Sequence, residues 1–150
     1  YARLPDGLRV SPLRLGELMR DFGGRAELWR RTGGVHACAL AGAAEGIVLF
    51  AEDVARHNAM DKVLGMALLR GVELGGKVVL TTGRLGAEIV SKAVACRVAV
   101  LASRSAVTSL AIELARRFGV TLVGFARGER MNVYTGFERI ADDQVEDWQR

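Results

Sequence analysis

Residues 77–126 read KVVLTTGRLGAEIVSKAVACRVAVLASRSAVTSLAIELARRFGVTLVGFA and carry the clearest structural pattern of the chain. Three apolar runs, at 77–82, 98–103 and 120–126, alternate with two segments of helical spacing, at 85–95 and 105–119. Continuous apolar runs are typical of parallel strands that are buried on both faces, and helices between them provide the crossovers. The segment therefore predicts a parallel sheet covered by helices.

The residues before this segment predict two more strands and three helices. Apolar runs at 35–41 and 46–52 are joined by a short glycine-containing loop, which indicates an antiparallel hairpin. Helical spacing at 58–70 follows, and Ser11-Pro12 is a typical start for a helix that ends at Gly23-Gly24 before a shorter one over 26–31. The expected fold is α/β, a three-layer α/β/α sandwich with a mostly parallel sheet and an antiparallel hairpin at its start.

Length and composition describe one globular domain. Of 150 residues, 50% are hydrophobic and 25% charged, as in ordinary folded domains rather than disordered chains. We divide the chain into an N-terminal helical segment (1–31), a ligand-binding domain (32–141) and a polar tail (142–150). The chain starts at Tyr1 rather than methionine, so we expect a fragment of a longer protein.

Charge and cysteine usage narrow the function classes. The net charge of +4 is modest and aromatic residues are few, so nucleic acid is not the expected partner. No apolar run reaches the roughly 18 residues of a membrane span, and no signal peptide opens the sequence. Cys38 and Cys96 lie in apolar surroundings and are expected to be free thiols in the reducing cytoplasm.

Arginines follow the predicted strands at their carboxyl ends, the edge where ligands bind in open parallel sheets. Like charges gathered at one edge repel unless an anion is present, so this edge is predicted to bind an anion, with helix N-termini at Asn58 and Ser105 adding amide groups. In the alternative interpretation each arginine is solvated or pairs with a helix acid such as Glu88 or Glu113. The four strand-end arginines are Arg56, Arg84, Arg104 and Arg127.

The segment EDVARHNAMDK, residues 52–62, concentrates polar side chains after the second predicted strand. Asn58 is expected to cap the following helix, with Asp61 reaching back to it from the N3 position. Capping does not account for Asp53, Arg56 and His57, which are expected at the anion-binding edge.

Several common motifs are missing from the sequence. It contains no G-x-G-x-x-G, no P-loop and no G-x-S-x-G. The order of elements is that of cytidine deaminases, whose zinc site needs H-x-E and P-C-x-x-C. His36 is followed by Ala37-Cys38, and Cys96 has neither the second cysteine nor the proline. We therefore expect no zinc, and we interpret His36 as a strand histidine with a hydrogen-bond partner.

Five segments together resemble the FdhD family, the formate dehydrogenase accessory sulfurtransferases. The likeness runs from Thr32 to Ile140, with the motifs in order. The segments are TGGVHACAL (32–40), EDVARHNAMDKVLG (52–65), TTGRLGAEIVSKA (81–93), LASRSAVTSLAIELA (101–115) and LVGFARGERMNVYTGFERI (122–140).

The resemblance implies a sulfur carrier that takes sulfur from a cysteine desulfurase and passes it to molybdenum bis(molybdopterin guanine dinucleotide), the cofactor that formate dehydrogenase needs. It further implies a cytidine-deaminase-like fold, a homodimer, and a pocket for the guanine dinucleotide that a free guanine nucleotide would mimic. His57 and Asp53 are the candidate assisting groups. The candidate ligand-binding residues are Phe125, Ala126, Arg127, Gly128, Glu129, Arg130, Arg84, Ser103, Arg104, Asn58 and Lys62.

The chain departs from the family pattern at the sulfur-carrying residue. The family's persulfide cysteine lies in a C-x-x-C loop N-terminal to the matched region, and these 150 residues contain no C-x-x-C. Ala55 and Val107 also replace a usual glycine and a usual proline. The leading hypothesis is therefore the cofactor-binding domain of a sulfurtransferase. The alternatives are a nucleotide-binding module without chemistry of its own and, less favoured, a divergent zinc deaminase.

Overall fold

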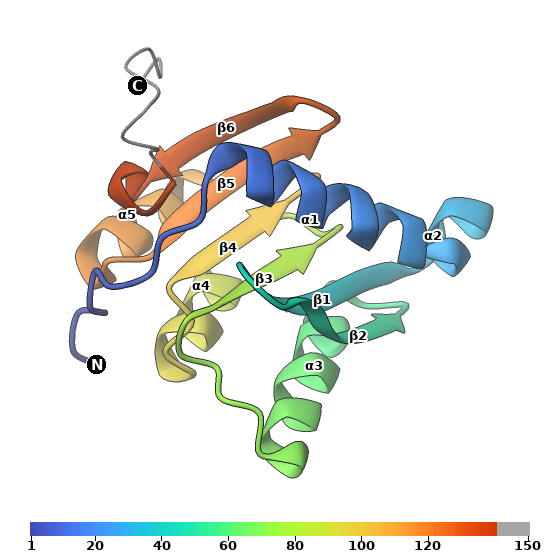
Figure 1. Ribbon diagram of the computed structural model, residues 1–150, viewed down its shortest axis with the longest axis horizontal. Helices are drawn as coiled ribbons and strands as arrows, with labels where there is room; N and C mark the ends of the chain where they lie inside the picture. The colour runs from blue at the N-terminus through green and yellow to red at the C-terminus, as the bar shows by residue number, and fades with distance from the viewer. Residues whose placement is uncertain (141–150) are drawn as a thin grey trace.

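The computed structural model describes residues 1–140, which form one six-stranded sheet with helices on both faces (Figure 1). The predicted tail, 142–150, lies outside the described residues. The elements in chain order are α1 (Pro12–Arg25), α2 (Glu27–Thr32), β1 (His36–Gly42), β2 (Gly46–Asp53), α3 (Arg56–Arg70), β3 (Lys77–Thr81), α4 (Ala87–Ala95), β4 (Val100–Ser103), α5 (Ser109–Phe118), β5 (Thr121–Arg127), β6 (Arg130–Thr135) and the 3-10 helix η1 (Phe137–Arg139).

The strand order β2-β1-β3-β4-β5-β6 sets which chain segments meet at each edge of the sheet. β3, β4 and β5 are parallel to one another, whereas β1 runs antiparallel to both β2 and β3, and β6 antiparallel to β5. The ends of β2, β3, β4 and β5 therefore share one edge with the starts of β1 and β6. We call this the carboxyl edge. The predicted α/β fold is confirmed, with parallel strands at its centre and the antiparallel hairpin at its start.

Two hydrophobic clusters, one on each face of the sheet, create the three layers. On β3, the side chain of Val79 packs with the cluster under α3, α4 and α5, while those of Val78 and Leu80 pack on the opposite side. Phe22 of α1 is completely buried in this second cluster, where it meets Phe50 of β2 edge to face. Figure 1 shows α1 crossing this face of the sheet. No described helix is long and apolar enough to cross a membrane.

β6 was not predicted, because its sequence RMNVYT lacks a continuous apolar run. It is an edge strand whose side chains are partly exposed, and it joins β5 through the two-residue turn Gly128-Glu129. Gly128 has a φ of 58°, a conformation that favours glycine at the first position of such a turn.

The predicted cap of α3 is wrong. The helix begins at Arg56, two residues before the expected position, and its N-cap Ala55 contributes no side-chain bond. The carboxylate of Asp53 instead accepts a hydrogen bond from the Ala55 amide, at 3.0 Å, which turns the chain into the helix earlier. Asp61 does not reach back to Asn58; it forms an ion pair with Lys92 of α4 at 2.9 Å.

The predicted start of α5 at Ser105 is also wrong. The helix begins at Ser109, capped by the hydroxyl of Thr108, which accepts a hydrogen bond from the Ala111 amide. The preceding residues instead form a parallel bridge between Val107 and Leu85. The hydrogen bonds of that bridge occupy the backbone groups that a longer helix would need.

Gly136 is predicted to be a position that no side chain can occupy. It has a φ of +63°, and an added Cβ would lie 2.1 Å from Thr121 Oγ1 and 3.0 Å from Thr121 Cα. Gly136→Ala is therefore expected to lower the free energy of unfolding by about 2–4 kcal/mol, through backbone strain and overpacking. Urea denaturation of Gly128→Ala is the matched control: its φ of +58° is similar, but nothing lies within 4 Å, so only about 1 kcal/mol is expected. Equal losses in the two variants would contradict the role given to Thr121.

Candidate functional site

Arg104 and Arg127 lie together at the carboxyl edge, as the strand-end pattern predicts. Arg127 Nε donates to the backbone oxygen of Arg104 at 2.9 Å, and the Arg104 guanidinium lies 4.9 Å from the centre of the Trp29 ring. Burial, and then the nearby charge of Arg127, lower the pKa of Arg104. Among residues 1–140 neither guanidinium is paired with a carboxylate, and Glu88 is close to His57 instead. The edge therefore has positive charge that the described chain does not neutralise.

A bulge in β5 turns Phe125 outward beside Arg127. The pairing with β6 shifts between Gly124 and Arg127, and Phe125 has a φ of 50° with 40% of its surface exposed. Its amide donates to the Ser105 oxygen at 3.0 Å, so the conformation is fixed from the neighbouring loop. Strained backbone of this kind is often found at binding sites.

The other predicted ligand-binding residues differ in their exposure to solvent. Arg84, Glu129 and Arg130 are exposed, whereas Ala126 is buried. Asn58 is also exposed, in the first turn of α3.

Ser103 is completely buried and its hydroxyl is used within the protein. It donates to the Gly83 oxygen at 2.6 Å and accepts from the Ser105 amide at 2.9 Å. These bonds hold the loops after β3 and β4 together. The contribution of Ser103 to the site is therefore to position Arg104 between these loops.

A second polar group lies at the same edge, where β1, β3 and α3 meet. Arg56 packs over Gly83 so closely that an added Cβ would lie 2.6 Å from Arg56 Cβ. His36 Nδ1 is 3.2 Å from Thr82 Oγ1, and burial followed by the charge of Arg56 lowers the pKa of His36. The sequence reasoning missed the place of His36 at this edge. The predicted antiparallel hairpin could have shown this, because it brings the start of β1, where His36 lies, next to the end of β2.

Three buried polar atoms within residues 52–57 have no hydrogen-bond partner in the described chain: Glu52 Oε2, Arg56 Nε and His57 Nδ1. Buried polar groups in folded proteins nearly always have partners, so water, a ligand or another chain segment is expected to pair with these atoms. His57 Nε2 lies 3.5 Å from Glu88 Oε2. An anionic ligand would pair with Arg56 Nε, whereas Glu52 Oε2 needs a hydrogen-bond donor instead.

Lys62 and Asp53 form an ion pair. Lys62 Nζ lies 2.8 Å from Asp53 Oδ2 and donates to the Glu52 oxygen at 2.9 Å. The hydrogen bond from Lys62, with that from the Ala55 amide, lowers the pKa of Asp53 to about 2. Asp53 therefore stays ionised at neutral pH and is not suited to proton transfer there.

Lys62→Met is expected to raise the pKa of Asp53 towards the ordinary carboxyl value. Because the folded-state pKa is depressed, the stabilisation from this pair is present above the unfolded pKa near 4 and lost as pH falls towards 2. NMR titration of the Asp53 carboxyl carbon measures the shift, and Lys92→Met, which breaks the Asp61 pair instead, is the control. An unchanged Asp53 titration in Lys62→Met would contradict the assignment.

Neither cysteine is suited to carry sulfur. Cys38 is completely buried in β1, and burial raises the pKa of its thiol to about 12. Cys96 caps the C-terminal end of α4, away from the carboxyl edge, and burial also raises its pKa. The thiolate is the nucleophile, so both groups are poorly reactive near neutral pH.

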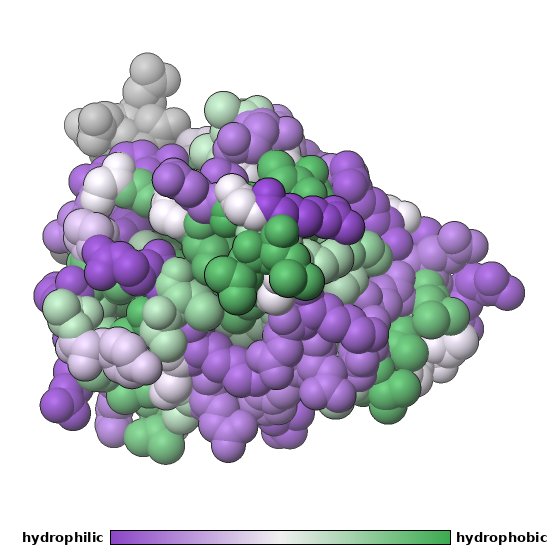
Figure 2. Space-filling view, turned by 90° about the horizontal axis from the view of Figure 1, so that it is seen from below, coloured by the Kyte–Doolittle hydropathy of each residue, from purple (hydrophilic) through white to green (hydrophobic). Residues whose placement is uncertain are grey.

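A separate cavity lies at the opposite edge of the sheet and differs in character. Its volume is about 710 Å³ and its lining includes Leu4, Leu68, Leu74 and Cys96. Figure 2, which views the molecule from below, shows hydrophobic residues grouped among hydrophilic ones. Arg9 and Arg97 also line this cavity and form no ion pair among residues 1–140. The carboxyl edge differs because two arginines are adjacent there, with Arg127 Nε bonded to the Arg104 oxygen.

Comparison with known proteins gives consistent matches. The family model described as FdhD/NarQ family matches residues 2–141. A protein from Anaeromyxobacter sp. (strain K) named sulfur carrier protein FdhD is 46% identical over 145 residues, covering 91% of this chain and 50% of its own length. One of the same name from Thermoplasma volcanium is 42% identical over 135 residues, covering 90% and 48%.

A solved structure gives the same result in three dimensions. The crystal structure of a protein from Desulfotalea psychrophila, assigned as a formate dehydrogenase accessory protein, superposes with a TM-score of 0.85 at 37% identity. The match covers 94% of this chain and 60% of the other. The chain spans about half the length of the curated relatives that it matches.

Proposed function

This chain belongs to the FdhD/NarQ family, and from that premise we propose that it is the part of a sulfur carrier that binds the guanine dinucleotide of molybdenum bis(molybdopterin guanine dinucleotide). The observation that supports this most strongly is the adjacency of Arg104 and Arg127 at the carboxyl edge without a paired carboxylate among residues 1–140. Guanidinium groups bind phosphate oxygens through paired hydrogen bonds.

In this proposal the arginines of the carboxyl edge hold phosphates and the bulge presents an aromatic surface. Arg84, Arg104, Arg127 and Arg130 form the phosphate-binding set, and Phe125 is placed to contact the base. Contact with an aromatic face is a common way to hold a planar heterocycle.

His57 is the group that we propose for proton movement during sulfur transfer. Imidazole is a common proton-transfer group in proteins, and His57 Nε2 lies 3.5 Å from Glu88 Oε2. Asp53 has a different role: its pairing with Lys62 holds the start of α3 in place beside His57.

The sulfur itself is proposed to come from elsewhere in the full-length protein. Cys38 and Cys96 have raised pKa values, so we place the persulfide on a cysteine outside residues 1–150, loaded by a cysteine desulfurase. Formate dehydrogenase is the proposed recipient of the sulfurated cofactor. The proposal further includes a homodimer that works in the cytoplasm.

Calorimetric titration with GDP tests the binding step. We expect GDP to bind at least about tenfold more tightly than guanosine, because each charge-assisted hydrogen bond contributes about 1.5–3 kcal/mol. The GDP affinity should also fall as salt rises, since the contacts are ionic. Equal binding of guanosine and GDP, or no binding of GDP, would overturn the proposal.

The cysteine environments also favour a second candidate, a nucleotide-binding module without chemistry of its own. The full-length protein separates the two. After loading by a cysteine desulfurase, a sulfur carrier should release labelled sulfur to the molybdenum cofactor. A binding module would bind the cofactor and release none.

A further inference from the structure

A pocket of about 550 Å³ lies beside the carboxyl edge, between the C-terminal end of α1, α2 and the loop after β4. Its lining includes Arg20, Gly23, Trp29, Arg30 and Arg104. We propose that this pocket is a diphosphate-binding subsite for a nucleoside diphosphate, additional to the strand-end residues. The proposal rests on the function proposed above and deepens it, because it gives the same ligand class a second set of contacts.

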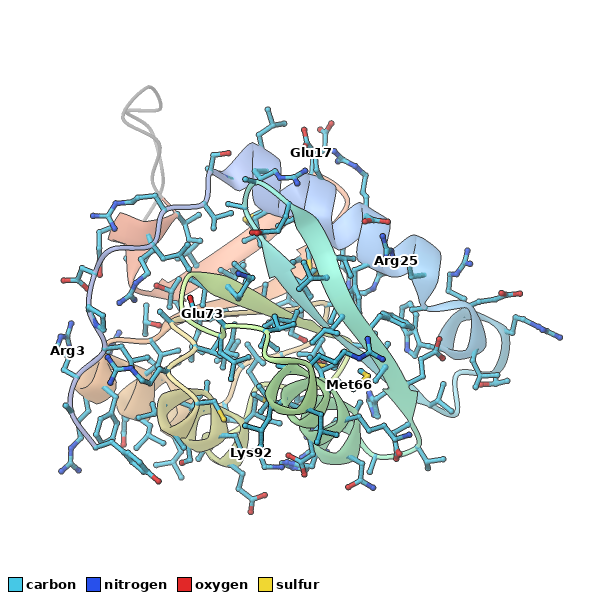
Figure 3. The ribbon with its side chains drawn as sticks, turned by 60° about the horizontal axis from the view of Figure 1, so that its bottom comes forward. Arg3, Glu17, Arg25, Met66, Glu73 and Lys92 are labelled. Atoms are coloured by element: carbon cyan, nitrogen blue, oxygen red, sulfur yellow. The ribbon has the colours of Figure 1, made fainter. Side chains whose placement is uncertain are left out.

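The charges of the two helices support an anion in this pocket. On their outer surfaces arginines pair with acids: Arg25 lies 3.2 Å from Asp21, and Arg31 lies 3.9 Å from Glu27. Figure 3 shows Arg25 on the outside of α1, with Glu17 farther along the same helix. The arginines that line the pocket have no such partner.

Within residues 1–140, neither Arg20, Arg30 nor Arg104 forms an ion pair. Three guanidinium groups around one pocket repel each other, and an anion between them would remove that repulsion. Within α1 and α2, the arginines away from the pocket, Arg14, Arg25 and Arg31, form ion pairs, whereas Arg20 and Arg30, which line it, do not.

Arg104 connects the pocket to the carboxyl edge. Its guanidinium stacks on Trp29, and an added Cβ at Gly23 would lie 3.7 Å from its Nη1, so it extends over the end of α1. Its backbone oxygen accepts the bond from Arg127. One ligand can therefore contact both the pocket and the strand-end residues.

The remaining features favour a small phosphorylated ligand over a peptide. The volume falls in the usual range for small-molecule sites. Gly23, Gly24 and Gly33 leave the backbone uncovered along the pocket. Arg30 Nη2 donates to the Gly24 oxygen at 3.1 Å, which holds the guanidinium at the rim while its other N–H groups stay available for phosphate.

Trp29 provides a direct reporter of occupancy. The chain has two tryptophans, Trp29 and Trp148, so Trp148→Phe leaves one emitter, located in the pocket. In this background, GDP and inorganic pyrophosphate are each titrated while fluorescence and heat are recorded. We expect both probes to change Trp29 emission, and we expect Arg20→Ala with Arg30→Ala to weaken both by at least about tenfold. Arg25→Ala with Arg31→Ala, on the same helices, is the control and should bind as the parent does.

Each outcome bears on one proposal or the other. If GDP binds by calorimetry but Trp29 emission does not change and the Arg20/Arg30 variant binds normally, the pocket proposal is overturned and the proposed function stands. If pyrophosphate binds in an Arg20- and Arg30-dependent way but GDP does not, the pocket binds diphosphate alone, and both its assignment to a nucleoside diphosphate and the guanine assignment fail. If neither probe binds, both fail. Equal weakening in the Arg25/Arg31 control would overturn the pocket, because net charge alone would then explain the effect.

Discussion

Replacing Arg104 and Arg127 together by alanine is expected to weaken GDP binding by at least about 100-fold. Each arginine is proposed to make charge-assisted hydrogen bonds to phosphate, which contribute about 1.5–3 kcal/mol apiece, and tenfold in affinity corresponds to about 1.4 kcal/mol. Arg104→Ala removes the guanidinium that stacks on Trp29 but keeps the backbone oxygen that accepts from Arg127. The two neighbouring positive charges interact, so the two losses are not expected to be independent. The two single variants and the double variant, titrated by calorimetry, measure both the effect and the coupling.

The matched control removes the same charge from the opposite end of the molecule. Arg70 and Arg116 lie in the last turns of α3 and α5 and are exposed. α3 starts at the carboxyl edge and runs for 15 residues, which places Arg70 about 20 Å away, beyond the Debye length at physiological salt. Arg70→Ala with Arg116→Ala should therefore change GDP affinity by less than about threefold. If it weakens binding as much as the first pair, GDP responds to net charge and not to this edge.

Arg139→Met is expected to lower the free energy of unfolding by about 3 kcal/mol. Arg139 is completely buried, and its guanidinium donates to the backbone oxygens of Gly119 at 2.7 Å and Pro5 at 2.8 Å. Those bonds join the N-terminal segment to the end of the sheet, and the Met side chain leaves the buried oxygens unpaired. At this chain length the melting temperature should fall by roughly 6–12 °C.

Asp6 provides the comparison for Arg139. Its carboxylate lies 3.2 Å from Arg139 Nη2, but its side chain is 58% exposed. Asp6→Asn should therefore cost less than about 1 kcal/mol in urea denaturation. If Asp6→Asn proves as destabilising as Arg139→Met, the ion pair, and not the backbone contacts, holds the N-terminal segment.

The gathering of strand-end arginines at one edge could be predicted from the sequence, because it follows from the sheet. Apolar runs at 77–82, 98–103 and 120–126 gave the parallel strands, and parallel strands bring Arg104 and Arg127 to one edge. The helix starts were predicted less well. Asn58 and Ser105 are good capping residues, but the turn at Asp53 and the bridge at Val107 decided where the helices begin.

Contacts between distant segments could not be predicted. Trp29 lies under Arg104 because α1 and α2 pack on the face of the sheet opposite α3, α4 and α5. No local pattern in the sequence predicts this packing. His36 is at the carboxyl edge because β1 is antiparallel to β3, a pairing that single-strand patterns leave open. β6 was missed because an edge strand with exposed side chains has no continuous apolar run.

Hydrogen exchange with and without GDP, followed by mass spectrometry, tests the central claim most directly. If the carboxyl edge binds the guanine nucleotide, exchange should slow in residues 83–86, 103–106 and 125–130, which lie at and just after the ends of β3, β4 and β5. Residues 71–76 and 96–99, which line the cavity at the opposite edge, should exchange as before. Slower exchange only in residues 71–76 and 96–99, with no change at the carboxyl edge, would contradict the proposed binding site.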